Sequence, residues 1–216
     1  MPPQSTPKRR AAFKRKLLAW FRTAARDLPW RRTRDPYRVL VSEFMLQQTQ
    51  VSRVLAYYPR FLRRYPDLAS LARATPHGVR EAWDGLGYYR RAANLHRLAR
   101  QVVKHHAGAI PSDPAALEDL PGVGPYTAGA ISTFAFEQPV PAVDTNAARV
   151  LKRVFGCRTA KEASATALAL QPRRGKTAWA FNQALMELGA LVCSARAPKC
   201  GECPVSRSCD WYLTNS

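Results

Sequence analysis

The chain has few acidic residues and lacks a long hydrophobic run. Of its 216 residues, 15 are Asp or Glu and 34 are Lys or Arg, so the formal net charge is +19. The best candidate for a membrane span, Ala180 to Cys193, is shorter than the roughly 18 residues required and contains Glu187. We therefore exclude a membrane-spanning protein. A charge surplus of this size favours a polyanionic partner, foremost nucleic acid; a generally basic surface is the alternative.

The N-terminus lacks the features of a secretion signal. Residues Met1 to Lys16 are basic, but no apolar stretch with a small-residue cleavage site follows them, so we expect a basic arm without regular structure. Cysteine is also scarce: there are five, and four of them fall between Cys193 and Cys209. A secreted domain held by disulfides would spread its cysteines along the chain. The clustering instead favours a metal site and a reducing compartment.

Sustained alternation of polar and apolar residues is absent, which argues against a substantial β-sheet. Apolar residues recur instead at helical spacing almost throughout. Three of these stripes are Phe13/Leu17/Phe21, Tyr37/Leu40/Phe44 and Val51/Leu55/Tyr58/Leu62. Prolines, among them Pro36, Pro59 and Pro121, divide the chain into about ten short helices. The sequence thus predicts an all-α fold.

The four clustered cysteines have the spacing of a metal-binding loop. Cys193, Cys200, Cys203 and Cys209 follow the pattern C-x6-C-x2-C-x5-C. Four thiolates so close in sequence suit either one zinc ion or a [4Fe–4S] cluster, and the spacing alone does not decide between them. Cys157 stands apart, and we expect it to be a small buried apolar residue.

Two glycines mark a tight turn between helical segments, in the stretch Leu120 to Ala128. Gly122 and Gly124 allow the backbone to approach another molecule closely. Amides of the turn and of the helix that follows can point at an anion, which in so basic a chain would be a DNA phosphate. A simple connector between helices is the alternative. No Gly-Lys-Ser/Thr follows, so a Walker loop is excluded.

Two of the rare carboxylates have unusual surroundings. Glu43 lies in an otherwise apolar helix, where partial burial would raise its pKa and suit it to act as an acid. Asp144 precedes the helix from Asn146 to Val154. Two converging carboxylates could cleave a glycosidic bond, one as acid and one as stabiliser of a sugar cation. The alternatives are that Glu43 faces water and that Asp144 only caps its helix.

Amide and aromatic side chains fall on two predicted turns. Gln47 and Gln48 end the helix of Glu43, and Tyr88 and Tyr89 follow a glycine-bounded turn. Amides can hydrogen-bond an orphaned base in an opened duplex, and aromatic rings can fill the vacated stack. A solvated helix end and ordinary core tyrosines are the alternatives.

Taken together, these segments resemble the helix-hairpin-helix DNA glycosylases, and within them the adenine (MutY) type. The similarity runs from Leu28 to Cys209. Its motifs are SEFMLQQTQV at 42–51, GLGYY at 85–89, LPGVG at 120–124 and VDTN at 143–146. The four-cysteine spacing is similar to that of the family's [4Fe–4S] loop.

The resemblance implies a two-lobed all-α fold. A six-helix lobe would span residues 28–138, and residues 1–27 with 139–216 would form a second lobe carrying the cluster. Double-stranded DNA with a mismatched or damaged base would be the partner of a monomer in the bacterial cytoplasm, associated with the nucleoid through its DNA. The turn at Gly122 and Gly124 would hold a phosphate. The cluster would fold the loop so that Arg196, Lys199 and Arg207 face further phosphates.

The resemblance also implies a mechanism. Gln48, next to Gln47, and one of Tyr88 and Tyr89 would wedge the base stack while the target base rotates out. Glu43 would protonate the departing purine at N7. Asp144 would stabilise the sugar cation, Asn146 would help to position it, and water would complete the hydrolysis.

Position 126 separates subclasses of this family. The similar endonuclease III enzymes have a lysine there, whose amine attacks the sugar and leads to strand cleavage. Tyr126 cannot form a Schiff base, so we expect a monofunctional glycosylase with weak or absent lyase activity. The adenine-type enzymes carry a further C-terminal domain that recognises 8-oxoguanine, whereas this sequence ends at Ser216. We expect either a shortened chain or a protein without that reader, which leaves room for a different substrate.

Three rival hypotheses remain. The first is an endonuclease III-like or mismatch-specific glycosylase that removes thymine or uracil. The second is a non-catalytic DNA-binding module, although the presence of both Glu43 and Asp144 argues against it. The third is a zinc-binding architectural protein.

Overall fold

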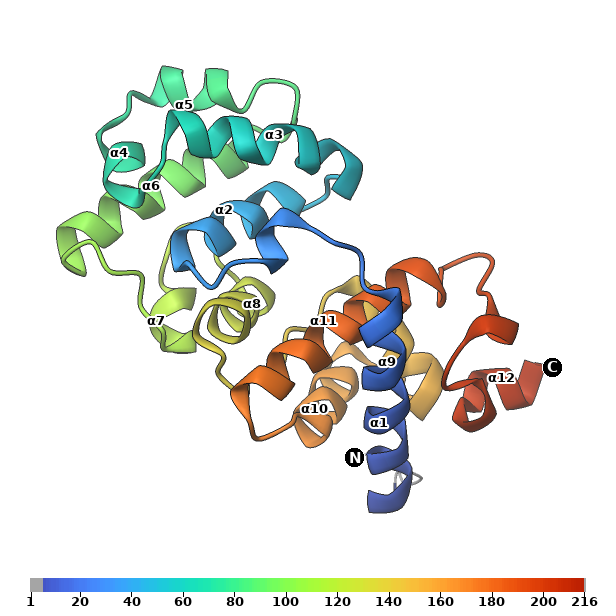
Figure 1. The fold of residues 1–216 in the computed structure, drawn as a ribbon. Coiled ribbons are helices and arrows are strands. Elements are labelled where there is room, and N and C mark those ends of the chain that lie inside the picture. The colour runs from blue at the N-terminus through green and yellow to red at the C-terminus, as the bar shows by residue number, and fades with distance from the viewer. Residues whose placement is uncertain (1–5, 216) are drawn as a thin grey trace. The chain divides into compact units, whose positions relative to one another are not determined.

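The computed structural model describes residues 6–215, and residues 1–5 and 216 lie outside this description (Figure 1). The described residues form twelve α-helices and three short 3-10 helices, with no β-strand among them. The prediction of an all-α fold is therefore confirmed. None of the helices from 6 to 215 is both long and apolar enough to cross a membrane. The chain forms two compact units, one of which is Asp27–Phe136; the segments before and after it form the other.

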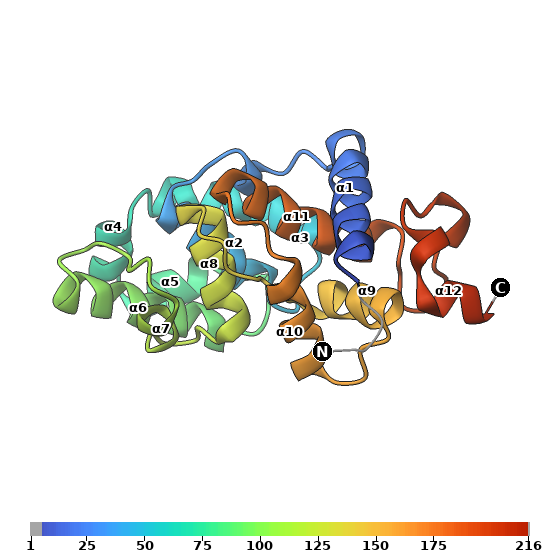
Figure 2. The same cartoon turned by 90° about the horizontal axis from the view of Figure 1, so that it is seen from below.

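The unit Asp27–Phe136 is built around a buried helix, α2. Its elements are η1 (Pro29–Arg31), α2 (Pro36–Leu46), α3 (Val51–Arg64), α4 (Leu68–Arg73), α5 (Pro76–Ala82), α6 (Arg90–His105), α7 (Pro114–Glu118) and α8 (Pro125–Phe136). Helix α2 packs against α3, α6 and α8, while α6 also packs against α4 and α5 (Figures 1 and 2). This core therefore carries α2 and α8 side by side.

The sequence explains where α2 begins and why it is central. The Asp35 carboxylate accepts hydrogen bonds from the backbone N–H groups of Tyr37 and Arg38, and Pro36 occupies the first helical position. Every residue from Val39 to Met45 is buried. A helix that is apolar on all sides is stable only when other helices surround it.

Helix α3 departs from the prediction in two ways. Pro59 lies inside the helix rather than at its end. The buried stripe runs through Val54, Tyr58 and Phe61, whereas Leu55 is 38% exposed. The two differences are related. Because Pro59 has no N–H, the carbonyl of Leu55 receives no hydrogen bond from it within the helix. Leu55 is exposed, so water can bond to this carbonyl instead.

The second unit contains α1 (Pro7–Ala24), α9 (Thr145–Phe155), α10 (Ala160–Leu170) and α11 (Gly175–Leu191). The cysteine segment follows, with η2 (Cys200–Glu202), η3 (Ser206–Ser208) and α12 (Asp210–Asn215). Helix α11 packs against both α1 and α9, and α9 also packs against α10 and α12. This unit has its own hydrophobic core, which includes Cys157 as predicted.

The predicted basic arm is largely helical, so that prediction is wrong for residues 7–16. The Thr6 side chain caps α1 by accepting from the Arg9 N–H, and Pro7 begins the helix. Phe13 packs edge-on against Phe155 and Phe181, with ring centroids 5.0 and 6.4 Å away. Burial of this apolar stripe stabilises the helix despite its basic outer face. The first five residues of the predicted arm lie outside the described residues.

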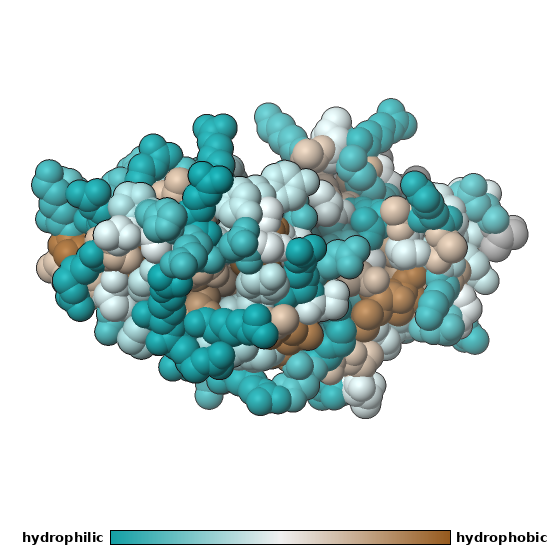
Figure 3. Space-filling view, turned by 90° about the horizontal axis from the view of Figure 1, so that it is seen from above, coloured by the Kyte–Doolittle hydropathy of each residue, from teal (hydrophilic) through white to brown (hydrophobic). Residues whose placement is uncertain are grey.

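Hydrophilic side chains predominate on the face of the molecule drawn in Figure 3. Hydrophobic side chains appear there as small, separate patches rather than one large area. A large exposed apolar patch would indicate a protein or membrane contact.

Candidate active-site residues and cysteine loop

Glu43 is buried within α2 and held by a residue of α8. Only 4% of Glu43 is exposed, so the alternative in which it faces water is wrong. The hydroxyl of Tyr126, the second residue of α8, donates a hydrogen bond of 3.0 Å to Glu43 Oε2. The packing of α8 on α2 therefore places a phenol against a buried carboxyl group and fixes its orientation.

The end of α2 also contacts α8. Gln47 follows the last residue of α2, and its Nε2 lies 3.5 Å from Thr127 Oγ1, which accepts a hydrogen bond. Gln48 is exposed and has a φ of 56°, in the left-handed region that non-glycine residues rarely adopt. The backbone thus presents the Gln48 side chain to solvent at the cost of local strain.

The glycine turn joins α7 to α8, so the predicted turn between two helical segments is present. Gly122 has a φ of 80°, and a Cβ there would lie 2.7 Å from Asn94 Nδ2. A Cβ on Gly124 would instead meet nothing within 4 Å. The first turn of α8 contains no acidic side chain, which leaves its N-terminal amides suited to an anion.

The structure separates the two tyrosines of the GLGYY turn. Tyr88 is 61% exposed and has a φ of 47°. Tyr89 is held within its own unit, because its hydroxyl donates to Asp84 Oδ1 at 2.5 Å and its ring lies 4.9 Å from the Arg80 guanidinium. Tyr88 is thus the more available of the two for contact with another molecule.

Asp144 caps α9, as one alternative in the sequence analysis expected. Its Oδ1 accepts from the Ala147 N–H at 2.6 Å, and its Oδ2 accepts from Asn146 Nδ2 at 2.9 Å. The cap does not remove the charge of the carboxylate, which stays half-buried at the positive end of the helix. Its two oxygens are held in a fixed direction by these two donors.

Arg149 connects this carboxylate to the cysteine loop, and sequence reasoning missed it. Its guanidinium donates to Asn146 Oδ1 at 2.7 Å, to the Gly189 carbonyl at 2.7 Å and to the Cys193 carbonyl at 2.8 Å. Gly189 makes this close approach possible, because a Cβ there would lie 2.7 Å from the Asn146 Cβ. An arginine three residues after Asn146, on the same helix face, is the signal that sequence analysis could have used.

All four predicted cysteines line one cavity of the second unit. Burial, together with charge repulsion from the other three cysteines, raises the pKa of the Cys203 thiol to about 11. The four sulfurs are therefore close enough to influence one another. Between residues 6 and 215, however, no three His, Cys, Asp or Glu side chains converge tightly enough to hold a single metal ion.

The comparisons with known proteins identify the family. A model described as "HhH-GPD superfamily base excision DNA repair protein" matches residues 41–173. The chain belongs to the HhH-GPD superfamily. The matched segment includes Glu43, the glycine turn, Tyr126, Asp144 and Arg149, but it ends before the four clustered cysteines, which begin at Cys193.

Two curated HhH-GPD relatives are similar over nearly the whole chain. The adenine DNA glycosylase of Mycobacterium tuberculosis is 48% identical over 202 residues, which cover 90% of this chain and 65% of that protein. The chain thus spans about two thirds of the length of this relative. The thymine-DNA glycosylase of Aeropyrum pernix is 38% identical over 210 residues, covering 93% of this chain and 94% of that protein. Among solved structures, a thermostable thymine-DNA glycosylase has a TM-score of 0.90 at 34% identity and covers 96% of this chain.

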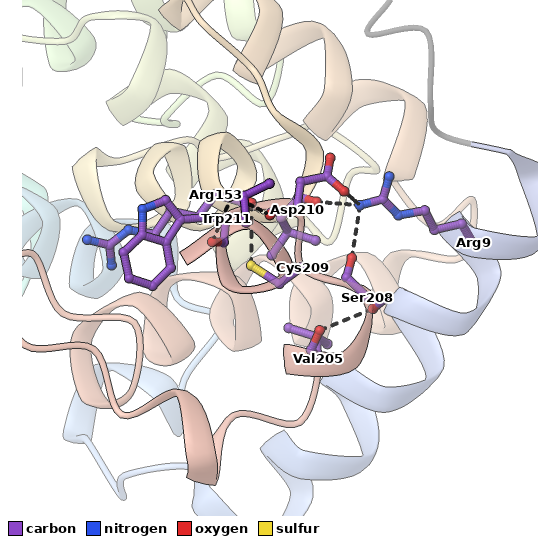
Figure 4. A network of polar contacts seen from close by, with 9 residues as sticks. Arg9, Arg153, Val205, Ser208, Cys209, Asp210 and Trp211 are labelled. Carbon is purple, nitrogen blue, oxygen red and sulfur yellow. Dashed lines mark hydrogen bonds and ion pairs between the residues drawn. The ribbon is translucent and has the colours of Figure 1, made fainter. Parts of the chain in front are cut away.

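Two arginines attach the cysteine segment of this HhH-GPD chain to helices (Figure 4). Arg153 donates to the carbonyls of Ser194 and Ala195 at 2.7 and 2.9 Å and to Cys193 Sγ at 3.4 Å. Its own carbonyl accepts from the Cys209 thiol at 3.3 Å. From α1, Arg9 reaches the carbonyls of Val154 and Ser208 at 2.5 and 2.9 Å and Asp210 Oδ1 at 2.6 Å.

The predicted site residues of the HhH-GPD chain thus fall into two groups. The unit Asp27–Phe136 contains Glu43, which is bonded to Tyr126, and Gln47, which is bonded to Thr127. The other unit contains Asp144, Asn146 and the cysteine loop. Three cations of the loop, Arg196, Lys199 and Arg207, are exposed. Lys199 Nζ lies 4.0 Å from Glu202 Oε2.

Proposed function

We propose that the chain is a monofunctional DNA N-glycosylase of base excision repair, of the adenine-releasing type. The observation that carries the proposal is the buried carboxyl group of Glu43, held by the Tyr126 hydroxyl at 3.0 Å. Loss of a purine from its sugar is accelerated by protonation of the purine, and a carboxyl group held in a buried position is suited to supply that proton. The net charge of +19 supports double-stranded DNA as the partner of a monomeric enzyme.

Extrusion of the target base is assigned to two exposed side chains on strained turns. Gln48 and Tyr88 both have left-handed backbone conformations, with φ values of 56° and 47°. Insertion of such side chains into the stack compensates for the unstacking that base flipping requires. Gly122 and Gly124 bind a backbone phosphate through the amides at the start of α8, and Arg196, Lys199 and Arg207 contact further phosphates.

The chemical step divides between two carboxyl groups. Glu43 transfers a proton to N7 of adenine as the bond between N9 and the sugar C1′ breaks, so adenine leaves as a neutral base. Asp144, oriented by Asn146 and by the N-terminus of α9, stabilises the positive charge that develops on the sugar. Water then adds its oxygen to C1′ and returns a proton to Glu43, leaving an abasic site.

Tyr126 excludes the alternative chemistry in which an amine attacks the sugar. A phenol cannot form the Schiff base that precedes β-elimination. The proposed product is therefore an abasic site in an intact strand. Tyr126 orients Glu43 in this mechanism rather than acting as a nucleophile.

We propose a [4Fe–4S] cluster as the group held by Cys193, Cys200, Cys203 and Cys209. The lining of the shared cavity fits such a group, because all four cysteines contribute to it and a [4Fe–4S] cluster takes four cysteine ligands. The loop holds only one C-x2-C pair, whereas structural zinc sites commonly combine two. When bound, the cluster fixes the fold of the loop, while Arg153 and Arg149 attach that loop to α9.

Removal of thymine or uracil opposite guanine is the second candidate. It is favoured by the thymine-DNA glycosylase of Aeropyrum pernix, which matches the chain over 94% of its own length. A pyrimidine has no N7 to protonate, so this activity would depend less on Glu43 than adenine release does.

One set of incubations tests the proposal and its rivals. The protein is mixed with duplexes that carry adenine opposite 8-oxoguanine, adenine opposite guanine, thymine or uracil opposite guanine, and thymine glycol. Strand breaks are then compared with and without hot alkali. Strand breaks at the adenine position that appear only after alkali support the proposal, whereas breaks without alkali indicate a lyase.

One variant and two further observations complete this test. Glu43→Gln should suppress adenine release, and thymine release that survives in this variant would favour the second candidate. Binding without release from any duplex would indicate a non-catalytic module. A colourless protein that contains zinc would contradict the proposed cluster, which gives a brown protein.

A further inference from the structure

Two turns of the unit Asp27–Phe136 share one buried cation, Arg91. The first turn follows α2 and contains Gln48, and the second lies between α5 and α6 and contains Tyr88. Each includes a non-glycine residue in the left-handed region. Such strain persists only where the surroundings hold the backbone in place.

Arg91 donates hydrogen bonds to both turns at once. Its Nη1 bonds to the carbonyls of Phe44 and Met45 at 3.1 and 2.8 Å and also to that of Gln47. Its Nη2 bonds to Thr49 Oγ1 at 2.9 Å. All these acceptors belong to the last residues of α2 and the turn after it.

The same Nη2 reaches the second turn, where it donates to the carbonyls of Leu86 and Gly87 at 3.2 and 3.1 Å. The guanidinium lies between two aromatic rings of this segment, 5.5 Å from the centroid of Trp83 and 5.4 Å from that of Tyr88. The exposed Tyr88 ring therefore rests on a group that is itself bonded to the turn of Gln48.

The cost of this arrangement argues for a role beyond packing. Arg91 is 7% exposed, and burial lowers its pKa. Within residues 6–215 the hydrogen bonds of its guanidinium go to five backbone carbonyls and one hydroxyl, with no carboxylate among them. A buried cation without a counter-ion is costly, and here six hydrogen bonds to acceptors on both turns offset that cost. What it adds is a fixed geometry between two turns.

We propose that Arg91 is a positioning residue that makes the turns of Gln48 and Tyr88 a single rigid wedge for opening duplex DNA. The inference rests on the proposed function, because it assigns both side chains to base extrusion. The planar fork of arginine is essential in this role, since the three donors of a lysine ammonium cannot span acceptors on two separate turns. Arg91 touches neither the target base nor the sugar.

The test uses Arg91→Lys in the full chain and two duplexes. One carries adenine opposite 8-oxoguanine, and the other carries adenine opposite a tetrahydrofuran abasic analogue, where the adenine has no pairing partner. We expect the single-turnover rate of release, relative to the wild type, to fall about tenfold or more on the paired duplex and less than about threefold on the unpaired one. Arg100→Lys, an exposed position of the same helix, should change neither rate.

Two further measurements separate positioning from stability. In the double variant Arg91→Lys/Tyr88→Ala, release from the paired duplex should be no slower than in Tyr88→Ala alone, because both changes remove the same wedge. Thr49→Val removes one acceptor of Arg91 at nearly constant volume. Thr49→Val should lower the single-turnover rate of release from the paired duplex about threefold. This measurement remains possible even if Arg91→Lys prevents folding.

If Arg91→Lys lowers the rate of release equally on both duplexes, or on neither, the inference is overturned. If the wild type releases no base at all, the proposed function fails instead. The wedge is then tested by 2-aminopurine placed beside the target position. Its fluorescence should rise when the wild type binds and not when Arg91→Lys binds, and an identical rise for both proteins would also refute the role of Arg91.

Discussion

Replacing Tyr126 by phenylalanine tests how the chain orients its buried acid. The change removes one hydroxyl, which donates to Glu43 Oε2 at 3.0 Å, and leaves the ring in its place on α8. A hydrogen bond to a charged group contributes about 1.5–3 kcal/mol, and about 1.4 kcal/mol corresponds to a tenfold change in rate. Because Glu43 is 4% exposed, water cannot readily replace the lost donor. We therefore expect base release to slow by about 10- to 100-fold.

The assay is single-turnover release of adenine opposite 8-oxoguanine, followed by alkali cleavage. Affinity for the abasic product should change less than about threefold, because Tyr126 acts on the acid and not on the phosphates. Tyr37→Phe is a matched control: it also removes a buried hydroxyl of this unit, which donates to the Tyr65 carbonyl at 2.8 Å. It should lower stability and leave the rate unchanged. A wild-type rate for Tyr126→Phe would refute the proposed orientation of Glu43.

Four other predictions follow from the same structure. Asp144→Asn should nearly abolish base release while DNA binding persists, since asparagine still caps α9 but carries no charge; a turnover rate equal to wild type would contradict the mechanism. Arg149→Met removes the donors to Asn146, Gly189 and Cys193 and should slow release at least tenfold, as measured at saturating protein. Tyr126→Lys should introduce strand breaks without alkali, visible on a denaturing gel. Raising the salt concentration should weaken DNA affinity steeply in a titration at several ionic strengths, because binding releases counterions from the phosphates.

The sequence predicted those features that depend on local patterns. Helical periodicity was sufficient for the all-α fold, and Pro36, one of the prolines predicted to divide the chain, is the first residue of α2. The family was predicted from its motifs, and the match over residues 41–173 confirms it. The four cysteines line one cavity, as their clustering indicated. In each case the informative residues form patterns within short segments of the sequence.

Contacts between distant segments were out of reach of this reasoning. Arg91 lies more than forty residues from the α2 carbonyls that it binds, and Arg149 is equally far from Cys193. Nothing in the local sequence distinguishes Arg91 from the many exposed arginines in so basic a chain, and for Arg149 only the three-residue spacing from Asn146 does. The choice between Tyr88 and Tyr89 likewise depends on Asp84 and Arg80, which hold only the second tyrosine. The helical fold of residues 7–16 follows from burial of Phe13 and its neighbours, which composition does not reveal.

The two carboxyl groups differ in the way that an acid and a charge stabiliser should differ. Glu43 is enclosed by the core of α2 and α8 and receives a phenolic hydroxyl, so one of its oxygens is fixed while the group stays shielded from water. Asp144 is half-buried at the N-terminus of α9, where backbone dipoles favour a negative charge. Pairs of titratable groups in such contrasting surroundings commonly divide acid and stabiliser between them. These surroundings support the proposed assignment over its reverse, because Asp144 lacks the enclosure that suits a proton donor and Glu43 lacks a helix N-terminus that favours an anion.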